Sequence, residues 1–166
     1  MTRRRLLSLL PAFGAFGASG AVTASAAGTP PSAGDISPLT LSDAEWRQRL
    51  SPAAYDVLRQ QGTERAFTSP LNGEKRRGRY ACAGCGLALF TSDMKFDSGT
   101  GWPSFFTSIA GAVQTKTDFK LILPRTEYHC ARCGGHQGHV FKDGPQPTGQ
   151  RWCNNGVALS FTPEAA

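Results

Sequence analysis

Two matching cysteine pairs, Cys82-Ala83-Gly84-Cys85 and Cys130-Ala131-Arg132-Cys133, lie 44 residues apart in the chain. Each pair has the C-x-x-C spacing, which lets both sulfurs of a short loop reach one metal ion. Glycines next to each pair supply the flexible backbone that such a loop requires. The four thiols therefore predict one structural zinc ion (Zn2+) per chain, bound by Cys82, Cys85, Cys130 and Cys133 with no open coordination position.

Two other uses of these cysteines stay open at this point. Two disulfide bonds are the ordinary alternative in an exported protein, and one C-x-x-C pair could be redox active. The matching form of the two pairs favours zinc over both alternatives.

The composition of the whole chain favours short strands and structured loops. Gly and Pro supply 19 and 11 of the 166 residues, whereas charged residues are only 18%. Short apolar stretches interrupted by Gly, Pro and Asn predict strands over residues 118–123, 125–130 and 156–161. The expected fold class is therefore mainly β, with antiparallel strands.

Two short helices are expected before these strands. Ser42 and Glu45 have the spacing of a capping box, which starts a first helix. Ser51 followed by Pro52 is typical of a second helix start, and Gly62 is expected to end that helix.

The fifth cysteine of the chain lies in the stretch Arg151-Trp152-Cys153-Asn154-Asn155. If this stretch is a strand, the side chains of Arg151, Cys153 and Asn155 point to one face. A guanidinium next to a thiol lowers the thiol pKa from about 8.5, and an amide can stabilise developing charge. Cys153 is therefore a candidate nucleophile, although a lone cysteine is more often an inert apolar residue.

Two histidines, His136 and His139, follow the second cysteine pair and lie among glycines. An imidazole near a nucleophilic thiol can donate or accept a proton at neutral pH. Spacing alone favours neither a catalytic role nor an ordinary packed or solvent-exposed position for each histidine. Zinc ligation is disfavoured because four thiolates already complete the coordination shell.

Several longer motifs occur in an order that matches a known family. They are residues 63–67 (TERAF), 95–105 (KFDSGTGWPSF), 133–141 (CGGHQGHVF), 143–149 (DGPQPTG) and 151–155 (RWCNN). With these motifs the chain resembles the type B methionine sulfoxide reductases, which are peptide-methionine (R)-S-oxide reductases. The corresponding domain is expected to span residues 41–163.

The resemblance implies a fold of two antiparallel β-sheets with a zinc site behind the active face. It implies an oxidoreductase that reduces the R epimer of methionine sulfoxide, free or in proteins, to methionine. Cys153 would be the nucleophile that becomes a sulfenic acid. His136 and His139 hold the family's positions for the general acid, and Arg151 and Asn155 hold positions that assist nucleophile and substrate.

The loop around Trp102 both supports the resemblance and departs from it. Trp102 occupies the position where the family places an aromatic wall against the substrate methyl group; from the residues alone it would be an ordinary core tryptophan. Many family members have a resolving cysteine in this Ser-Gly-x-Gly-Trp loop, where this chain has Thr100. We therefore expect an external thiol, such as a thioredoxin-like reductant, to regenerate Cys153.

Residues 1–26 have the pattern of a secretory signal peptide. Arg3, Arg4 and Arg5 precede an uncharged apolar stretch, and Ala24-Ser25-Ala26 is a small-x-small site. Paired arginines are typical of twin-arginine signals, which predicts an exported, periplasmic or extracellular protein. A retained membrane anchor is the alternative, which the glycines in the stretch disfavour. Residues 27–40, rich in Gly, Pro and Ser, are expected to form a flexible linker.

The charge distribution disfavours nucleic acid as a partner. The net charge is +6, and it falls to +3 without the three arginines of residues 1–26. We expect oxidised proteins and a thiol reductant as partners, and a monomer. Two other functions stay open: a zinc-ribbon binding module without catalysis, and a thiol–disulfide oxidoreductase that uses a C-x-x-C pair.

Overall fold

The structure is a computed structural model in which residues 36–120 and 123–165 are described. The expected signal peptide, residues 1–26, and most of the expected linker lie outside the described residues. The last part of that linker, residues 36–40, has no regular secondary structure. Within the described ranges, no helix has the length and apolar character needed to cross a bilayer.

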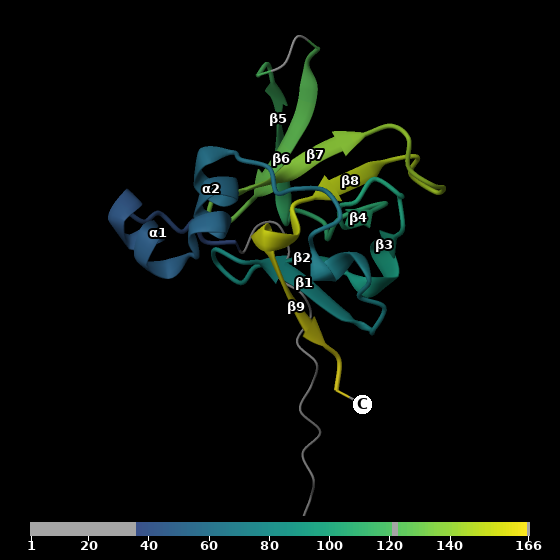
Figure 1. Ribbon diagram of the computed structural model, residues 1–166, viewed down its shortest axis with the longest axis horizontal. Helices are drawn as coiled ribbons and strands as arrows, with labels where there is room; N and C mark the ends of the chain where they lie inside the picture. Colours follow the sequence, from purple (N-terminus) through teal and green to yellow (C-terminus); the bar gives the residue numbers. More distant parts are fainter. Residues whose placement is uncertain (1–35, 121–122, 166) are drawn as a thin grey trace, which may run out of the picture. The chain divides into compact units, whose positions relative to one another are not determined.

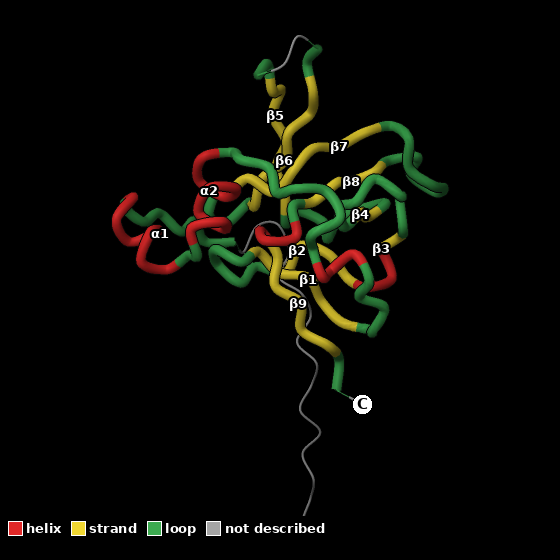
Figure 2. Tube along the Cα trace, in the orientation of Figure 1, coloured by secondary structure: helices red, strands yellow, loops and turns green. Residues whose placement is uncertain are grey.

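The strands form two antiparallel sheets, which confirms the expected fold class (Figures 1 and 2). The smaller sheet has the order β2-β1-β9, with bounds β1 (Gly78–Cys82), β2 (Ala88–Thr91) and β9 (Leu159–Pro163). The larger sheet has the order β3-β4-β8-β7-β6-β5. Its bounds are β3 (Lys95–Phe96), β4 (Ser104–Phe105), β5 (Val113–Asp118), β6 (Arg125–Cys130), β7 (His136–Phe141) and β8 (Arg151–Asn154).

Both expected helices are present and begin at the expected caps. The capping box of Ser42 and Glu45 is formed at the start of α1 (Asp43–Arg49). The Ser51 hydroxyl accepts a hydrogen bond from the backbone of the first turn of α2 (Pro52–Gln60). The left-handed residue that ends α2 is Gln61, one position before the glycine expected to do so.

Two strand predictions need correction. The strand expected over residues 118–123 lies earlier, as β5, and the exposed side chains of Phe119 and Leu123 follow its end. The stretch 156–161 begins as a 3-10 turn, Gly156–Ala158, before β9 starts. The carboxylate of Glu64 accepts hydrogen bonds from the backbone N–H groups of Gly156 and Val157, and these bonds hold the turn in place of a strand.

The core lies where aromatic side chains of the two sheets meet. Phe90 of β2 stacks on Phe105 of β4, with ring centroids 4.0 Å apart. Tyr80 of β1 meets the same ring edge-on, and Tyr128 of β6 meets the ring of Phe90. Because these rings are fully buried, they fix how the two sheets pack and leave the opposite face of β7 and β8 for a site.

Candidate active site

The four cysteines of the two pairs form one buried cluster between the sheets. Cys82 ends β1 and Cys130 ends β6, so the cluster joins a strand of each sheet. The sulfurs of Cys82 and Cys133 are 3.6 Å apart, and those of Cys85 and Cys130 are 3.5 Å apart. These separations exceed the S–S bond of about 2.05 Å and approach the edge of a tetrahedron with metal–sulfur bonds of about 2.3 Å. The four thiols are therefore positioned to hold a metal ion rather than two disulfides.

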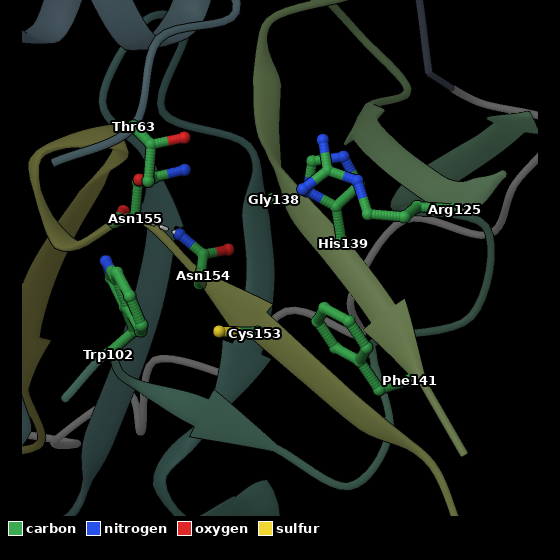
Figure 3. Close-up of a pocket in the computed structure, with 9 residues that line it drawn as sticks. All are labelled: Thr63, Trp102, Arg125, Gly138, His139, Phe141, Cys153, Asn154 and Asn155. Atoms are coloured by element: carbon green, nitrogen blue, oxygen red, sulfur yellow. Dashed lines mark hydrogen bonds between the residues drawn. The ribbon is translucent and has the colours of Figure 1, made fainter. Parts of the chain in front are cut away.

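Cys153 lies apart from this cluster, on β8 of the larger sheet. It pairs directly with His139 of β7 on one side and with Ser104 of β4 on the other. Side chains of directly paired residues lie on the same face of an antiparallel sheet, so the imidazole and the thiol share one face. Figure 3 shows the sulfur at the floor of a cavity between Trp102 and Phe141.

The net shift in the pKa of the Cys153 thiol is opposite to the lowering expected from the neighbouring guanidinium. Burial raises the pKa of Cys153, and this effect outweighs the lowering by Arg151 and by a hydrogen bond from Thr100. The Asp143 carboxylate accepts two hydrogen bonds of 2.9 Å from the Arg151 guanidinium, which fixes the position of the cation. The thiolate is therefore favoured by Arg151 against a desolvation cost.

His139 lines the cavity and is held by a carboxylate. Its Nε2 lies 2.7 Å from Oδ2 of Asp118, at the end of β5. The same oxygen accepts a hydrogen bond of 2.7 Å from Arg125. The backbone N–H of Lys120, the imidazole of His139 and Arg125 lower the pKa of Asp118, so this carboxylate is charged beside the imidazole.

His136 lies behind His139 and does not line the cavity. It is only 3% exposed, and its Nδ1 lies 2.7 Å from Oε1 of the buried Glu127. Burial lowers the pKa of His136. Its ring meets that of His139 edge-on, with centroids 5.4 Å apart. The two predicted histidines are therefore neighbours, with His139 at the cavity and His136 behind it.

Asn155 borders the cavity, but its amide is already bonded to the backbone. Its oxygen accepts a hydrogen bond of 3.0 Å from the backbone N–H of Glu64, and its nitrogen donates one of 3.0 Å to the carbonyl of Gln137. β8 ends at Asn154, so Asn155 follows the strand, and its side chain borders the same cavity as Cys153. Asn155 joins the end of β8 to the segment that contains Glu64.

Trp102 forms the wall of the cavity opposite His139 (Figure 3). Its indole N–H donates a hydrogen bond of 3.1 Å to the carbonyl of Glu64, which fixes the plane of the ring. The aromatic position expected from the resemblance is therefore at the cavity and not in the core.

Several residues of this site have no recognisable signal of their own in the sequence. Asp118 and Arg125 flank the loop between β5 and β6, and Arg125, Thr63 and Phe141 line the cavity. Glu127 is the buried partner of His136. Glu127 lies among polar residues in the strand RTEYHC, so no pattern in the sequence indicates that its side chain is buried. Asp118 and Arg125 meet only through the pairing of their strands.

The chain combines a mainly β fold with a candidate thiol site. A half-buried cysteine, an imidazole–carboxylate pair and an aromatic wall share one cavity, and a separate cluster of four thiols joins the sheets. Comparison with known proteins gives the family. Residues 50–163 match the SelR domain, and the chain belongs to this family.

Curated relatives agree with the assignment. A protein of Thiobacillus denitrificans named peptide methionine sulfoxide reductase MsrB is 54% identical over 124 residues, which are 74% of this chain and 94% of the relative. The protein of the same name from Agrobacterium fabrum is 52% identical over 123 residues, 74% of this chain and 91% of the relative. The chloroplastic peptide methionine sulfoxide reductase B1 of Arabidopsis thaliana is 52% identical over 123 residues, 74% of this chain and 61% of the relative. The family favours an enzyme over a zinc-ribbon binding module.

Proposed function

We propose that Cys153 of this protein reduces the R epimer of methionine sulfoxide in proteins by direct attack on the sulfoxide sulfur. As a member of its family, the protein is a peptide-methionine (R)-S-oxide reductase. The observation that carries the proposed role of Cys153 is its direct pairing with His139 at the floor of a cavity walled by Trp102. This pairing places a nucleophile, a proton donor and an aromatic surface around one small volume.

The first step transfers the sulfoxide oxygen to the enzyme. The Cys153 thiolate attacks the sulfoxide sulfur and forms a sulfur–sulfur bond while the oxygen takes up one proton. The hydroxyl then passes to the Cys153 sulfur, and the substrate's sulfur–oxygen bond and the new sulfur–sulfur bond both break. Methionine leaves and Cys153 carries the oxygen as a sulfenic acid, so the cysteine is oxidised by two electrons and the substrate is reduced by two. The step requires a general acid because the oxygen must be protonated as it leaves methionine.

His139 is the proposed general acid, because it faces the cavity and His136 does not. Asp118 holds Nε2 of His139 at 2.7 Å, which leaves Nδ1 for the substrate oxygen. The Asp118 carboxylate also fixes the orientation of the imidazole in the cavity. His136 is proposed as a positioning residue, which packs against His139 and is fixed by Glu127.

The remaining predicted residues hold the nucleophile and the substrate. Arg151 stabilises the thiolate and is itself fixed by Asp143. Trp102 is proposed to contact the substrate methyl group. Asn155 is proposed to keep the cavity in shape through its bonds to the backbone of Glu64 and Gln137.

Regeneration is proposed to use external thiols, such as those of a thioredoxin-like protein. A first thiol attacks the Cys153 sulfenic acid, water leaves, and a mixed disulfide forms; a second thiol then releases reduced Cys153 as the reductant becomes a disulfide. Thr100 supports this route, because a hydroxyl group near Cys153 occupies the position where many family members have a resolving cysteine. The four clustered thiols are proposed to hold one structural zinc ion and take no part in these steps.

The assay that tests the proposal is turnover of separated R and S epimers of a methionine sulfoxide peptide with a chemical dithiol. We expect reduction of the R epimer only, and complete loss in Cys153→Ser with unchanged thermal unfolding. The matched control is Trp152→Phe, which alters the neighbouring half-buried side chain on the other face of β8. Equal turnover of both epimers, or activity in Cys153→Ser, would contradict the proposal.

We also propose export and a monomeric state. The pattern of residues 1–26 supports a twin-arginine signal followed by a linker to residue 40, with the catalytic domain at residues 41–163. Fractionation of cells that express the natural chain and an Arg3→Lys/Arg4→Lys/Arg5→Lys variant tests export. We expect the natural chain outside the cytoplasm and the variant within it. Equal retention of both proteins in the cytoplasm would contradict export.

A further inference from the structure

Three large hydrophobic side chains are strongly exposed among the described residues. They are Phe67, Phe119 and Leu123, with exposed fractions of 74%, 74% and 76%. Single exposed apolar residues are common on protein surfaces, so their location decides whether they carry meaning. All three lie within a few residues of groups that line or support the cavity of Cys153.

Phe67 lies on the Trp102 side of the cavity. Its backbone N–H donates a hydrogen bond of 2.7 Å to the carbonyl of Gly101, the residue before Trp102. The ring packs closely over Gly101, where an added Cβ would meet it at 2.8 Å. Phe67 also has a φ of 65°, a left-handed conformation that is uncommon for an aromatic residue. An exposed ring is therefore held at this edge despite an unfavourable backbone.

Phe119 and Leu123 lie on the opposite side, at the end of the hairpin formed by β5 and β6. Phe119 directly follows Asp118, which contacts His139. Leu123 lies two positions before Arg125, which lines the cavity. An ion pair of 2.7 Å between Asp118 and Arg125 joins the two strands at this point. Figure 3 shows Arg125 and His139 across the cavity from Trp102, and Figure 1 shows the β5–β6 hairpin reaching beyond its neighbours.

The cavity itself is too small for more than one side chain of a protein substrate. Its volume is about 120 Å³, below the roughly 300–1,000 Å³ of pockets that enclose whole ligands. The residues on either side of a bound methionine sulfoxide must therefore lie outside the cavity, over its two edges. On one side, Phe67 lines a second hollow together with Gly101 and Trp102. On the other side, Phe119 and Leu123 are close in the chain to Asp118 and Arg125, which lie beside His139.

We propose that Phe67, Phe119 and Leu123 form an apolar rim that binds apolar residues flanking methionine sulfoxide in an extended segment of an oxidised protein. This inference rests on the proposed function of Cys153. Methionine usually packs among apolar residues, and its oxidation makes it polar and disrupts that packing. A segment released in this way exposes apolar neighbours together with the sulfoxide, and the rim offers them a surface next to the cavity.

The test compares three substrates that share the R-sulfoxide. They are N-acetyl-methionine sulfoxide, a peptide with glycine and serine on both sides of the sulfoxide, and a peptide of equal length and charge with leucine and valine there. The enzymes are the natural chain, Phe119→Ser/Leu123→Ser, and Gln114→Ser as the control. Gln114 is exposed on the same strand as Asp118, at the other end of the hairpin.

The natural enzyme and the Gln114→Ser control should show a higher kcat/KM for the apolar peptide than for the glycine–serine peptide. In Phe119→Ser/Leu123→Ser, kcat/KM for the apolar peptide should fall roughly fivefold to tenfold, mainly through KM, while the N-acetyl substrate changes less than about twofold. Phe67→Asn, which suits a left-handed backbone, should give the same selective loss from the other side of the cavity.

Two results would contradict the proposed rim. The first is an equal kcat/KM of the natural enzyme for the two peptides. The second is a decrease in kcat/KM of Phe119→Ser/Leu123→Ser that is the same for the apolar peptide and the N-acetyl substrate. A change of oligomeric state by light scattering in Phe119→Ser/Leu123→Ser, without a change in peptide preference, would assign these side chains to a contact between copies of the chain. Absence of turnover of all three substrates by the natural enzyme would instead overturn the proposed function, and with it the proposed rim.

Discussion

His139 and Cys153 lie directly opposite each other on the antiparallel strands β7 and β8. The cross-strand pairing puts an imidazole and a thiol on the same face, although 13 residues separate them in the chain. On the side of β7 away from Cys153, the residue paired with His139 is Glu127 of β6, the buried partner of His136. One row across the larger sheet therefore carries the proposed nucleophile, the proposed acid and the carboxylate behind them.

The two histidines should differ in their effect on catalysis. His139→Gln removes the imidazole at the cavity, and we expect kcat to fall about 100-fold or more, the usual contribution of a general acid. His136→Gln removes a buried positioning residue, so a smaller loss of kcat and a lower thermal midpoint are expected. Steady-state kinetics and thermal unfolding of both variants check this. A larger loss of kcat in a fully folded His136→Gln would reverse the assignment.

Removal of Arg151 should move the pH dependence of the reaction. Burial raises the pKa of Cys153 and Arg151 opposes this effect, so Arg151→Gln should raise the pKa further. The rate of alkylation by iodoacetamide follows the thiolate, and its acidic limb should shift to higher pH in the variant. Arg132→Gln, next to Cys133 and away from the cavity, is the control and should leave the limb in place. An unshifted limb in Arg151→Gln would show that the guanidinium does not stabilise the thiolate.

Stability should fall as the pH decreases below about 7. Burial lowers the pKa of His136, so the unfolded chain binds a proton more readily than the folded protein does. Stability from this group is complete above the unfolded pKa of about 6.5 and decreases as the pH falls below it. Urea unfolding between about pH 8 and 5 should show this slope, and His136→Gln should reduce it. Part of the slope should remain, because burial also lowers the pKa of His129.

Removal of the proposed zinc should destabilise the whole domain. The four thiols join β1 of one sheet to β6 of the other, so their loss uncouples the sheets. We expect release of one zinc per chain and loss of near-ultraviolet circular dichroism with a strong chelator. Cys85→Ser should cost several kcal/mol of folding free energy (on the order of 3–5), whereas Cys153→Ser should cost little. Full metal retention in Cys85→Ser would contradict the four-thiol site.

A cysteine at position 100 should change how the enzyme is regenerated. The Thr100 hydroxyl is near enough to Cys153 to lower its pKa, so we expect the thiol in Thr100→Cys to reach the sulfenic acid. After a single turnover without reductant, mass spectrometry should find an intramolecular disulfide in Thr100→Cys and a sulfenic acid in the natural chain. An intramolecular disulfide that involves Cys153 in the natural chain would contradict regeneration by external thiols.

The local features of this protein could be predicted from the sequence because each depends on residues that are close in the chain. The caps at Ser42 and Ser51 act within three residues, and a C-x-x-C pair places two sulfurs side by side without help from distant strands. The family motifs likewise identified Cys153 and Trp102. The strand over 118–123 failed because alternation does not show where a β-hairpin ends, and the apolar residues there are exposed.

Contacts between distant segments were decided only by the tertiary structure. Strand register places His139 rather than His136 at the cavity, and pairing of β5 with β6 brings Asp118 and Arg125 together beside it. Burial raises the pKa of Cys153 even though the neighbouring Arg151 lowers it. Register and desolvation are properties of the packed sheets, because each depends on residues that approach one another only when the chain has folded.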